Sequence, residues 1–404
     1  MILTYSENYF HFNIILKLLV NINKVYQDIA LKNILHLERK FTSKTETFIV
    51  NQVNTIDRYN VIVASIRDTK NLDCIKKVII PENVDWISKS ARYLSNKTAN
   101  DLFNQLKEYD IALIHAHFVI DAWFFLKLTK KFNVPKVVSG YGHDVTRVKN
   151  DYFGYGKQML KKAMKEYDCV LAMCEDMKKD ILKIGCDEEK IKIHYHGVDV
   201  SKFVFPERVY GEKESFDILQ VGTLEPKKAQ DLVLEALSVL QKEHKINNFT
   251  YTCIGEGELE EMLRVKVKEL GLEDKVKIRG YFKYASAEHI NAYRTADVFI
   301  HPSITLANYE KEGIPGTIVE AMASGLPVVS TYHAGIPEII KSEEDGLLLE
   351  ERDVKGLANA LYRLSQSPAL REKLGKNAQK TASNKLDLQT GTNSLQTIYD
   401  ELLK

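Results

Sequence analysis

The stretch Glu312–Thr331, EGIPGTIVEAMASGLPVVST, has the pattern of a helix followed by a buried strand. Pro315 fits the first helical turn, where a missing backbone N–H costs nothing. Gly325 fits the position just after the helix, and Pro327 prevents the helix from continuing. The β-branched run Val328–Thr331 then predicts a short, buried strand of a parallel sheet. A helix followed by such a strand is typical of an α/β fold.

The start of this predicted helix has the features of an anion site. The backbone N–H groups of Gly316, Thr317 and Ile318 would point out of the helix and bind a phosphate. Glu312 lies in the preceding loop and Glu320 about one turn inside the helix. A phosphate site between two carboxylates that bind hydroxyl groups suits a sugar nucleotide. Glutamates also occur near helix starts because they complement the helix dipole, so spacing alone leaves both interpretations open.

Composition indicates an ordinary globular protein. Its 404 residues predict two domains of roughly 200 residues each. A net charge of +1 argues against a nucleic-acid binder. The five cysteines show no CxxC spacing, which argues against a disulfide framework or a zinc knuckle and favours a cytoplasmic location. No apolar run is long enough to span a membrane, and the start lacks the features of a signal peptide.

Strand-length apolar runs alternate with helical stretches along the chain, which predicts two parallel-sheet domains with a ligand cleft at the carboxyl ends of their strands. We expect an N-terminal extension (1–31), an N-terminal domain (32–208), a C-terminal domain (209–385) and a closing segment (386–404). The extension contains an apolar run, Phe10–Val20, which fits an extra packed helix, an interfacial anchor or an unordered segment. The expected strands are Ile34–Leu37, Val61–Ile66, Ile111–His117, Lys136–Ser139, Cys169–Met173, Ile191–His194, Phe216–Val221, Phe249–Ile254, Lys275–Gly280, Val298–Ile300, Pro327–Thr331 and Gly346–Leu349.

The stretch from Glu312 resembles the signature of retaining GT-B glycosyltransferases, in which two glutamates separated by seven residues precede A-M-A-x-G-x-P-V-V. The resemblance implies two Rossmann-like, doubly wound parallel-sheet domains that face a central cleft. The N-terminal domain would bind the acceptor and the C-terminal domain the nucleotide sugar. The closing segment would form a helix that crosses back to the N-terminal domain. By the same resemblance, Glu312 contacts the donor sugar and Glu320 the ribose hydroxyls.

A second motif of this family resembles Gly222–Ala229, GTLEPKKA. The usual pattern is G-R-x-x-x-K-K-G, whose arginine and second lysine contact the diphosphate. Gly222 and Lys228 match, and the resemblance gives Lys228 the diphosphate. Thr223 replaces the arginine and supplies neither its charge nor its fork of donors. A solvated lysine at a helix start is the plain alternative for Lys228.

Two further loops of the second domain resemble donor-binding elements. Gly280–Lys283, GYFK, matches the position that holds the nucleobase, which makes Tyr281, Phe282 and Lys283 the expected base pocket. Core packing of Tyr281 or Phe282 is equally compatible with the pattern. The turn AGIPE resembles a family turn close to the donor sugar and places Gly335 there.

The N-terminal domain has weaker motifs. TETF at Thr45–Phe48 resembles an element of the subgroup that builds exopolysaccharide and O-antigen chains. This similarity would place Thr45 and Glu46 on the acceptor side, although Glu46 also completes a capping box with Ser43. The sequence HAHF at His115–Phe118 matches the same subgroup and makes His117 an acceptor-side candidate. A metal cluster that includes these histidines is conceivable, but the family needs no protein-bound metal, so we expect none.

The sequence SGYGHDV, residues 139–145, departs from the T-F-H-G-Y-D-V of relatives, whose histidine lies near the reacting sugar. Tyr141 occupies the histidine position, and His143 replaces the tyrosine. If the segment is extended, a shift of two residues keeps the same face, and we therefore expect His143 to be the catalytic histidine. Tyr141 is the alternative polar group, and Asp144 matches the family directly.

These features together predict a retaining glycosyltransferase that transfers a hexose to a hydroxyl of a glycan or lipid-linked glycan. The donor would be a nucleoside-diphosphate sugar, with a UDP-sugar expected, and no cofactor would be needed. The protein would be cytoplasmic, with peripheral contact at the inner face of the membrane. A GT-B sugar-nucleotide epimerase and a non-catalytic sugar-nucleotide-binding protein are the alternatives.

Overall fold

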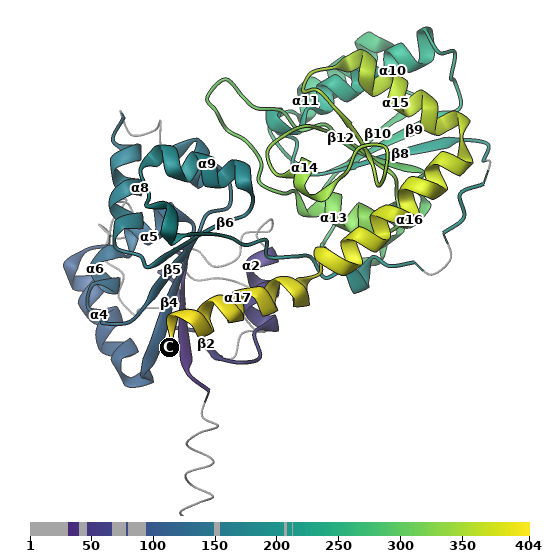
Figure 1. Ribbon diagram of the computed structural model, residues 1–404. Helices are drawn as coiled ribbons and strands as arrows, with labels where there is room; N and C mark the ends of the chain where they lie inside the picture. The colour runs from purple at the N-terminus through teal and green to yellow at the C-terminus, as the bar shows by residue number, and fades with distance from the viewer. Residues whose placement is uncertain are drawn as a thin grey trace, which may run out of the picture.

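The computed structural model describes residues 31–39, 47–66, 78–79, 94–148, 154–205, 208–211 and 213–404. Two α/β lobes lie side by side, each with a central sheet and helices on both of its faces (Figure 1). Most of the expected N-terminal extension, 1–31, and the candidates Thr45 and Glu46 fall outside the described residues. None of the described helices has the length and apolar content needed to cross a membrane.

The first lobe contains a seven-stranded sheet with the order β3-β2-β1-β4-β5-β6-β7, and every pairing in it is parallel. The apolar runs correctly predicted all of these strands except β3, which has only two residues and sits at the sheet edge. Its strands are β1 (Asn33–Leu37), β2 (Asn60–Ala64), β3 (Val78–Ile79), β4 (Ile111–His117), β5 (Lys136–Ser139), β6 (Cys169–Ala172) and β7 (Ile191–Ile193). Its helices include α2 (Thr47–Thr55), α4 (Asn96–Leu106), α5 (Val119–Phe124), α6 (Leu126–Thr129), α7 (His143–Thr146), α8 (Gly156–Lys165) and α9 (Glu175–Ile184).

The second lobe contains a six-stranded parallel sheet with the order β10-β9-β8-β11-β12-β13, and each of its expected strands is present. Its strands are β8 (Phe216–Val221), β9 (Phe249–Ile254), β10 (Val276–Arg279), β11 (Val298–His301), β12 (Val328–Thr331) and β13 (Leu347–Leu349). Its helices are α10 (Gln230–Lys242), α11 (Glu260–Leu270), α12 (Ala287–Thr295), α13 (Gly316–Ala323), α14 (Ile336–Ile339), α15 (Val354–Gln366) and α16 (Pro368–Lys385).

Both sheets reverse their strand order at an internal point, between β1 and β4 in the first and between β8 and β11 in the second. In doubly wound sheets, ligands bind beyond the carboxyl ends of the strands at this switch point. The two sheets therefore confirm the predicted fold class and place a binding crevice where the lobes meet.

Helix α13 and strand β12 form within Glu312–Thr331, as the sequence predicted. Pro315 is the residue that caps the helix rather than a member of its first turn, and the helix begins at Gly316. Gly325, at φ +72°, ends it, with the Leu326 N–H donating to the Ala321 carbonyl at 3.0 Å. Such a left-handed position favours glycine, so the predicted helix end is confirmed.

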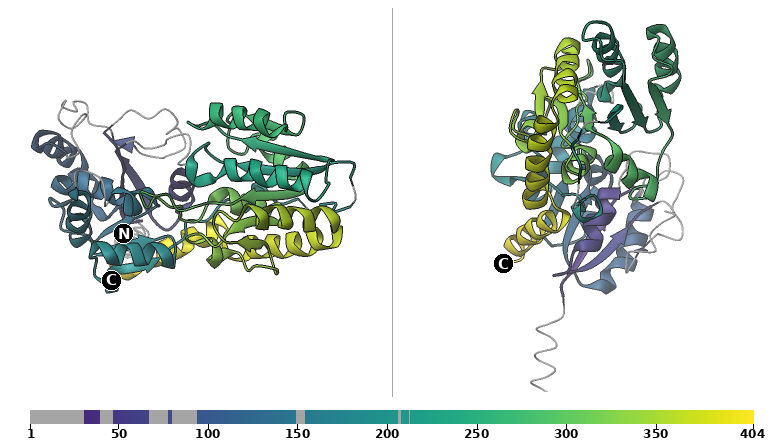
Figure 2. Two further views of the ribbon diagram at one scale, coloured as in Figure 1. Left: turned by 90° about the horizontal axis from the view of Figure 1, so that it is seen from above. Right: turned by 90° about the vertical axis from the view of Figure 1, so that its right-hand side faces the viewer.

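Helix α17 (Leu388–Leu402) returns from the second lobe to the first, where it runs alongside the sheet (Figures 1 and 2). On its buried face, the Tyr399 hydroxyl lies 2.5 Å from His115 Nδ1 of β4. At the crossing point, Val198 and Asp387 form a parallel bridge. Gly197, at φ +76°, is required there because a Cβ atom would lie 2.5 Å from the Asp387 carbonyl oxygen. The chain therefore connects the two lobes at two adjacent places.

Candidate active site

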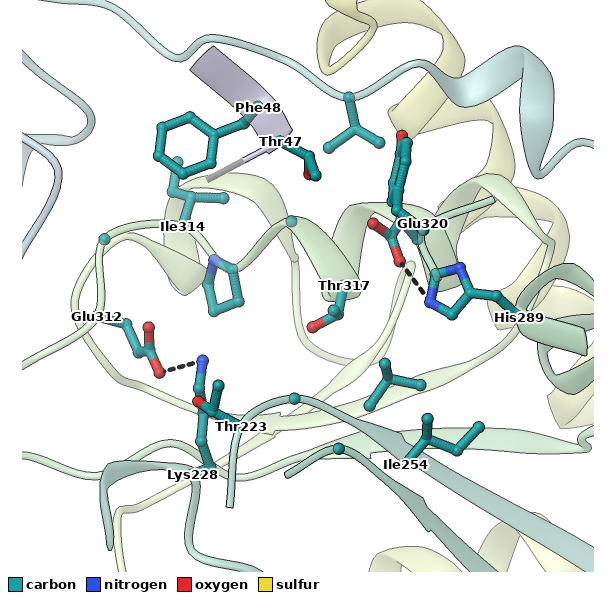
Figure 3. Close-up of a pocket in the computed structure, with 18 of the residues that line it drawn as sticks. Thr47, Phe48, Thr223, Lys228, Ile254, His289, Glu312, Ile314, Thr317 and Glu320 are labelled. Carbon is teal, nitrogen blue, oxygen red and sulfur yellow. Dashed lines mark ion pairs between the residues drawn. The ribbon is translucent and has the colours of Figure 1, made fainter. Parts of the chain in front are cut away.

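A cavity of about 440 Å³ lies between the lobes (Figure 3). The second lobe contributes the ends of β8 and β9, the start of α13 and the loop before it. The first lobe contributes α2, Tyr141 and the segment that begins at His196. The predicted residues that line the cavity are Glu312, Lys228, Glu320, Gly222, Thr223, Gly316, Thr317, Tyr281, Phe282 and Tyr141.

Glu312 and Lys228 form an ion pair at one end of the cavity. Lys228 Nζ lies 2.5 Å from Glu312 Oε1, and each side chain is 12% exposed. Burial opposes ionisation of Glu312, but Lys228 and Lys227 outweigh burial and lower the pKa of its carboxyl to about 2. Glu312 is therefore a fixed negative charge that can accept hydrogen bonds from ligand hydroxyl groups.

Glu320 lies at the other end of the cavity, on α13. It is buried, accepts a 2.7 Å hydrogen bond from the Tyr293 hydroxyl, and has His289 Nε2 at 3.8 Å. Burial raises the pKa of the Glu320 carboxyl to about 7, and the Tyr293 hydrogen bond only partly offsets this. Burial also lowers the pKa of His289 to about 4, so His289 supplies no compensating charge near neutral pH.

Between the two glutamates, the start of α13 offers backbone donors. Gly316 and Thr317 line the cavity, as expected for an anion site. The Ile318 N–H instead donates to the Pro315 carbonyl at 3.1 Å, and Ile318 itself is buried. The expected set of three donors is therefore reduced to the N–H groups of Gly316 and Thr317.

The loops after β8 and β9 approach each other closely below this helix start. Gly255 has φ +154°, and a Cβ atom there would lie 1.9 Å from the Gly222 carbonyl oxygen. A glycine is therefore needed at residue 255 for the two loop backbones to make contact. This close approach leaves room for Thr223 and Lys228 at the cavity floor (Figure 3).

The expected base-binding loop is only partly in the cavity. Tyr281 and Phe282 line it, whereas Lys283 lies outside the described lining residues. Gly335 also lies outside that lining, and packs behind the Glu312 loop with its N–H 3.3 Å from the Gly313 carbonyl oxygen. A Cβ atom at Gly335 would lie 2.7 Å from Ile314, so this glycine permits close packing.

In the first lobe, Tyr141 rather than His143 faces the cavity. The extended geometry expected for this segment is wrong, because Gly142 has φ +142° and α7 begins at His143. The turn leaves His143 exposed, outside the described cavity lining. Asp144 is buried, and its carboxylate accepts hydrogen bonds from the backbone N–H groups of Tyr141, Gly142 and Val119 at 2.8–3.0 Å. Asp144 thus holds the turn that presents Tyr141.

His117 lies behind Tyr141 in a group of buried histidines. His117 Nδ1 is 2.7 Å from the Tyr141 hydroxyl, and its Nε2 is 2.9 Å from His36 Nδ1. His36, His115 and His117 could each direct one ring nitrogen to a shared metal ion. Most nitrogens of these rings already have hydrogen-bond partners, with His115 bonded to Tyr399 and Ser139, whereas His36 Nε2 is buried without a partner among the described residues. A hydrogen-bonded core that supports Tyr141 accounts for the same contacts.

Several residues at the site were not identified from sequence. Thr47 and Phe48 of α2 line the cavity. His289 lines it from α12, and Tyr293 follows four residues later on that helix. The i, i+4 spacing places the two on one helix face, which is a signal the sequence does contain. Which residues this helix face contacts depends on tertiary packing, which the spacing does not reveal.

Comparison with known proteins agrees with this geometry. Residues 206–381 match the family Glycosyl transferases group 1, and residues 56–202 match Glycosyltransferase Family 4. The structure of Anabaena Alr3699/HepE in complex with UDP-glucose superposes with a TM-score of 0.75 at 20% identity, and covers 92% of this chain and 100% of that chain. The chain has the GT-B fold.

Curated relatives of this GT-B protein include polysaccharide enzymes. The amylovoran biosynthesis glycosyltransferase AmsK of Erwinia amylovora is 34% identical over 268 residues, which cover 64% of this chain and 62% of AmsK. The chain thus aligns with about three fifths of that relative's length. A UDP-Gal:alpha-D-GlcNAc-diphosphoundecaprenol alpha-1,3-galactosyltransferase of Escherichia coli is 24% identical, with 76% of this chain and 80% of that enzyme covered.

Proposed function

We propose that the protein is a retaining glycosyltransferase that moves a hexose from a UDP-sugar to a hydroxyl of a glycan or lipid-linked glycan in bacterial surface polysaccharide synthesis. The observation that carries this proposal is that Glu312, Lys228, Glu320 and the start of α13 line one cavity between the two lobes. Two carboxylates on either side of an anion site match a ligand with a sugar, a diphosphate and a ribose.

The two glutamates would bind opposite ends of the donor. The ribose hydroxyls would donate to Glu320, and the transferred sugar would donate to the ionised Glu312. The diphosphate between them would accept hydrogen bonds from the N–H groups of Gly316 and Thr317. Lys228 is paired with Glu312, and an arriving diphosphate would take over Lys228 and free Glu312 for the sugar.

Transfer breaks the bond between the anomeric carbon and the diphosphate oxygen and forms a bond to the acceptor oxygen, whose proton is released. Negative charge grows on the leaving diphosphate, and Lys228 with the two N–H groups would stabilise it, a contribution that is often the largest in enzyme catalysis. These groups neutralise the diphosphate without a metal, so we expect turnover to survive chelation. Retention of configuration is inferred from the resemblance to retaining GT-B enzymes.

The acceptor would approach from the first lobe, where Tyr141 and α2 face the donor site. Acceptor chemistry is supported by the two curated relatives, one named for amylovoran synthesis and the other for transfer to a diphosphoundecaprenol-linked sugar. With a lipid-linked acceptor the enzyme would work in peripheral contact with the inner face of the membrane.

A donor panel tests the proposal. Purified protein is incubated with UDP-glucose, UDP-galactose and UDP-N-acetylglucosamine, with and without glycan acceptors and with EDTA, and UDP release and product anomers are followed by NMR. We expect UDP release that Glu312→Gln and Lys228→Ala suppress, with an axial product from an axial donor. An epimerised donor without UDP release would indicate an isomerase instead. Tight UDP-sugar binding without any turnover would indicate a binding protein.

A further inference from the structure

The loop between β11 and α13, residues 302–315, carries Glu312 and is held from behind by two residues outside the cavity lining. These are His333, which follows β12, and Glu351, which follows β13. His333 is fully buried. Neither belongs to a motif that we identified in the sequence.

The hydrogen bonds around His333 determine its tautomer. The backbone N–H of Glu312 donates to His333 Nε2 at 3.1 Å, so this nitrogen carries a lone pair. The neutral ring therefore has its proton on Nδ1, which lies 2.6 Å from Glu351 Oε1 and donates to it. A carboxylate that orients an imidazole, which in turn orients a functional group, is a recurrent way to fix geometry in protein sites.

Glu351 also anchors the other end of the same loop. Its Oε2 accepts from the Thr305 N–H at 2.8 Å, and its Oε1 accepts from the Thr305 hydroxyl at 2.9 Å. Burial opposes ionisation of Glu351, but the donors of His333 and Thr305 prevail and lower its pKa to about 2. The next residue, Arg352, has φ +69° and donates to the Thr305 carbonyl at 2.7 Å. The loop is thus bound at Thr305 and at Glu312 by one His–Glu pair.

We propose that His333 and Glu351 are positioning residues that hold the Glu312 backbone where its carboxylate meets the donor sugar and Lys228. This inference rests on the proposed transfer reaction for its functional meaning, but the anchoring itself does not. Lys311 and Gly313, the neighbours of Glu312, are also held, by an ion pair from Lys311 to Asp180 at 2.7 Å and by the Gly335 N–H at 3.3 Å, so the distinct role of the His–Glu pair is to fix the N–H of Glu312 itself. A misplacement of about 1 Å at a reacting centre is enough to cost roughly 10²-fold in rate.

Two substitutions of His333 separate the two hydrogen bonds. In His333→Gln the side-chain oxygen can reach the position of Nε2 and still accept from the Glu312 N–H. In His333→Asn the shorter amide reaches only the position of Nδ1, so the bond to Glu351 is retained and the Glu312 N–H loses its acceptor. Glu351→Gln is a third variant, because an amide cannot accept from all of the donors that a carboxylate accepts here. Thr381→Val, which removes a 2.9 Å hydrogen bond to Asp345 in the same lobe, is the control for a general loss of stability.

Three measurements on each full-length variant test the proposal: kcat and KM with the UDP-sugar, the dissociation constant of UDP, and hydrogen exchange of the peptide that contains Glu312. We expect His333→Asn and Glu351→Gln to lower kcat roughly 10- to 100-fold, by analogy with misplaced catalytic groups. We also expect UDP affinity within about twofold of wild type, because UDP lacks the sugar. Hydrogen exchange at the Glu312 N–H should be faster in His333→Asn than in wild type. In His333→Gln it should be slower than in His333→Asn, and kcat should be partly restored.

Equal kcat in His333→Asn, His333→Gln and Thr381→Val would overturn the positioning role. A parallel loss of kcat and UDP affinity, together with a lower melting temperature, would show that His333 only stabilises the lobe. If wild type transfers no sugar, the proposed function fails. Hydrogen exchange then still decides whether the His–Glu pair anchors the loop, because it needs no turnover.

Discussion

The two carboxylates of the cavity, Glu312 and Glu320, are both buried but differ in the groups that surround them and in the direction of their pKa shifts. Glu312 is paired with Lys228 at 2.5 Å, and its pKa is lowered to about 2. Glu320 has only a hydroxyl donor and a neutral histidine beside it, and its pKa is raised to about 7. Figure 3 shows the two pairs at opposite ends of the cavity, with Thr317 between them.

The difference shows that burial alone does not decide the charge of a carboxyl group. Both glutamates are desolvated, which favours the neutral acid, and at Glu312 the neighbouring lysines reverse this. The Glu312 end, which we propose binds the sugar, is therefore charged in advance, whereas the Glu320 end, which we propose binds the ribose, gains its charge near neutral pH or when a ligand binds. Hydroxyl donors from a ribose would stabilise the ionised form of Glu320 and release a proton.

Removing Lys228 should have the largest effect on the difference between Glu312 and Glu320. Lys228→Ala takes away the group that keeps Glu312 ionised and that would stabilise the leaving diphosphate. We expect turnover to fall on the order of 10²-fold, the usual cost of losing one preorganised charge-stabilising group. Steady-state transfer assays measure this, with the exposed Lys341→Ala as a charge-matched control. Turnover within about twofold of wild type would move the diphosphate contact elsewhere.

At the ribose end, Glu320→Ala should weaken binding of the bare nucleotide by roughly 1.5–3 kcal/mol, the range for hydrogen bonds to charged groups. Glu312→Gln should leave UDP affinity nearly unchanged, since its partner is the sugar. Calorimetry with UDP and with the UDP-sugar separates the two. A wild-type affinity for UDP in folded Glu320→Ala would remove the ribose role.

The raised pKa of Glu320 also predicts that the stability of the folded protein depends on pH. The folded carboxyl keeps its proton up to about pH 7, whereas the unfolded one loses it near its ordinary value of 4.5. Between these pH values the folded state binds more protons, so the contribution of Glu320 to stability falls as pH rises. Glu320→Gln should flatten this fall in thermal unfolding across pH 5–8. An unchanged slope would show that Glu320 is ionised in the folded protein throughout this range.

Substitutions on the first-lobe side of the cavity test whether polar contacts to the donor extend into that lobe. Tyr141→Phe should lower transfer by about tenfold, the cost of one hydrogen bond of roughly 1.4 kcal/mol. His143→Ala should remain within about twofold, because the turn at Gly142 leaves that side chain exposed. UDP affinity should be unchanged in both. A larger loss in His143→Ala would mean that this turn rearranges when the acceptor binds.

The smallest expected effect concerns only the surroundings of Glu320. Tyr293→Phe removes the hydroxyl that lowers the pKa of Glu320, so that pKa should rise further. The midpoint of UDP-sugar binding against pH should move upward by about one unit or less, since one unit corresponds to about 1.4 kcal/mol. Titrations at several pH values measure this midpoint. A downward shift would show that Tyr293 does not stabilise the ionised form.

The strand pattern was the most predictable part of the molecule, because strands buried on both faces need continuous apolar runs such as Val298–Ile300. Of the strands that the structure describes, β3, with its two residues, was not predicted. The start of α13 could also be located, because its glycine and proline positions indicate a helix start. The resemblance to GT-B glycosyltransferases, rather than spacing, pointed to the two glutamates and Lys228 as site residues. Contacts between distant segments could not be predicted from the sequence. The Glu320–Tyr293 bond and the Glu351–His333–Glu312 chain join segments whose proximity depends on how the helices and loops pack.

The extended geometry from which His143 was predicted was wrong for a local reason. A two-residue shift keeps a side chain on the same face only in an extended strand. Gly142 turns the backbone instead, and Asp144 stabilises the turn by binding its N–H groups. The Asp in SGYGHDV was thus a sign of a capped turn, and this would have argued against an extended segment.

The return of α17 has a consequence for synthesis of the protein on the ribosome. Leu395 and Tyr399 of α17 are buried against the first lobe, and Gln396 accepts from the backbone N–H groups of Asp57 and Arg58. The sheet of the first lobe is translated first, the whole second lobe follows, and α17 comes last. The first lobe therefore emerges with part of its apolar surface uncovered, and this surface is covered only after the second lobe has been made. Nascent chains interrupted before residue 388 should thus depend on chaperones more than complete ones do.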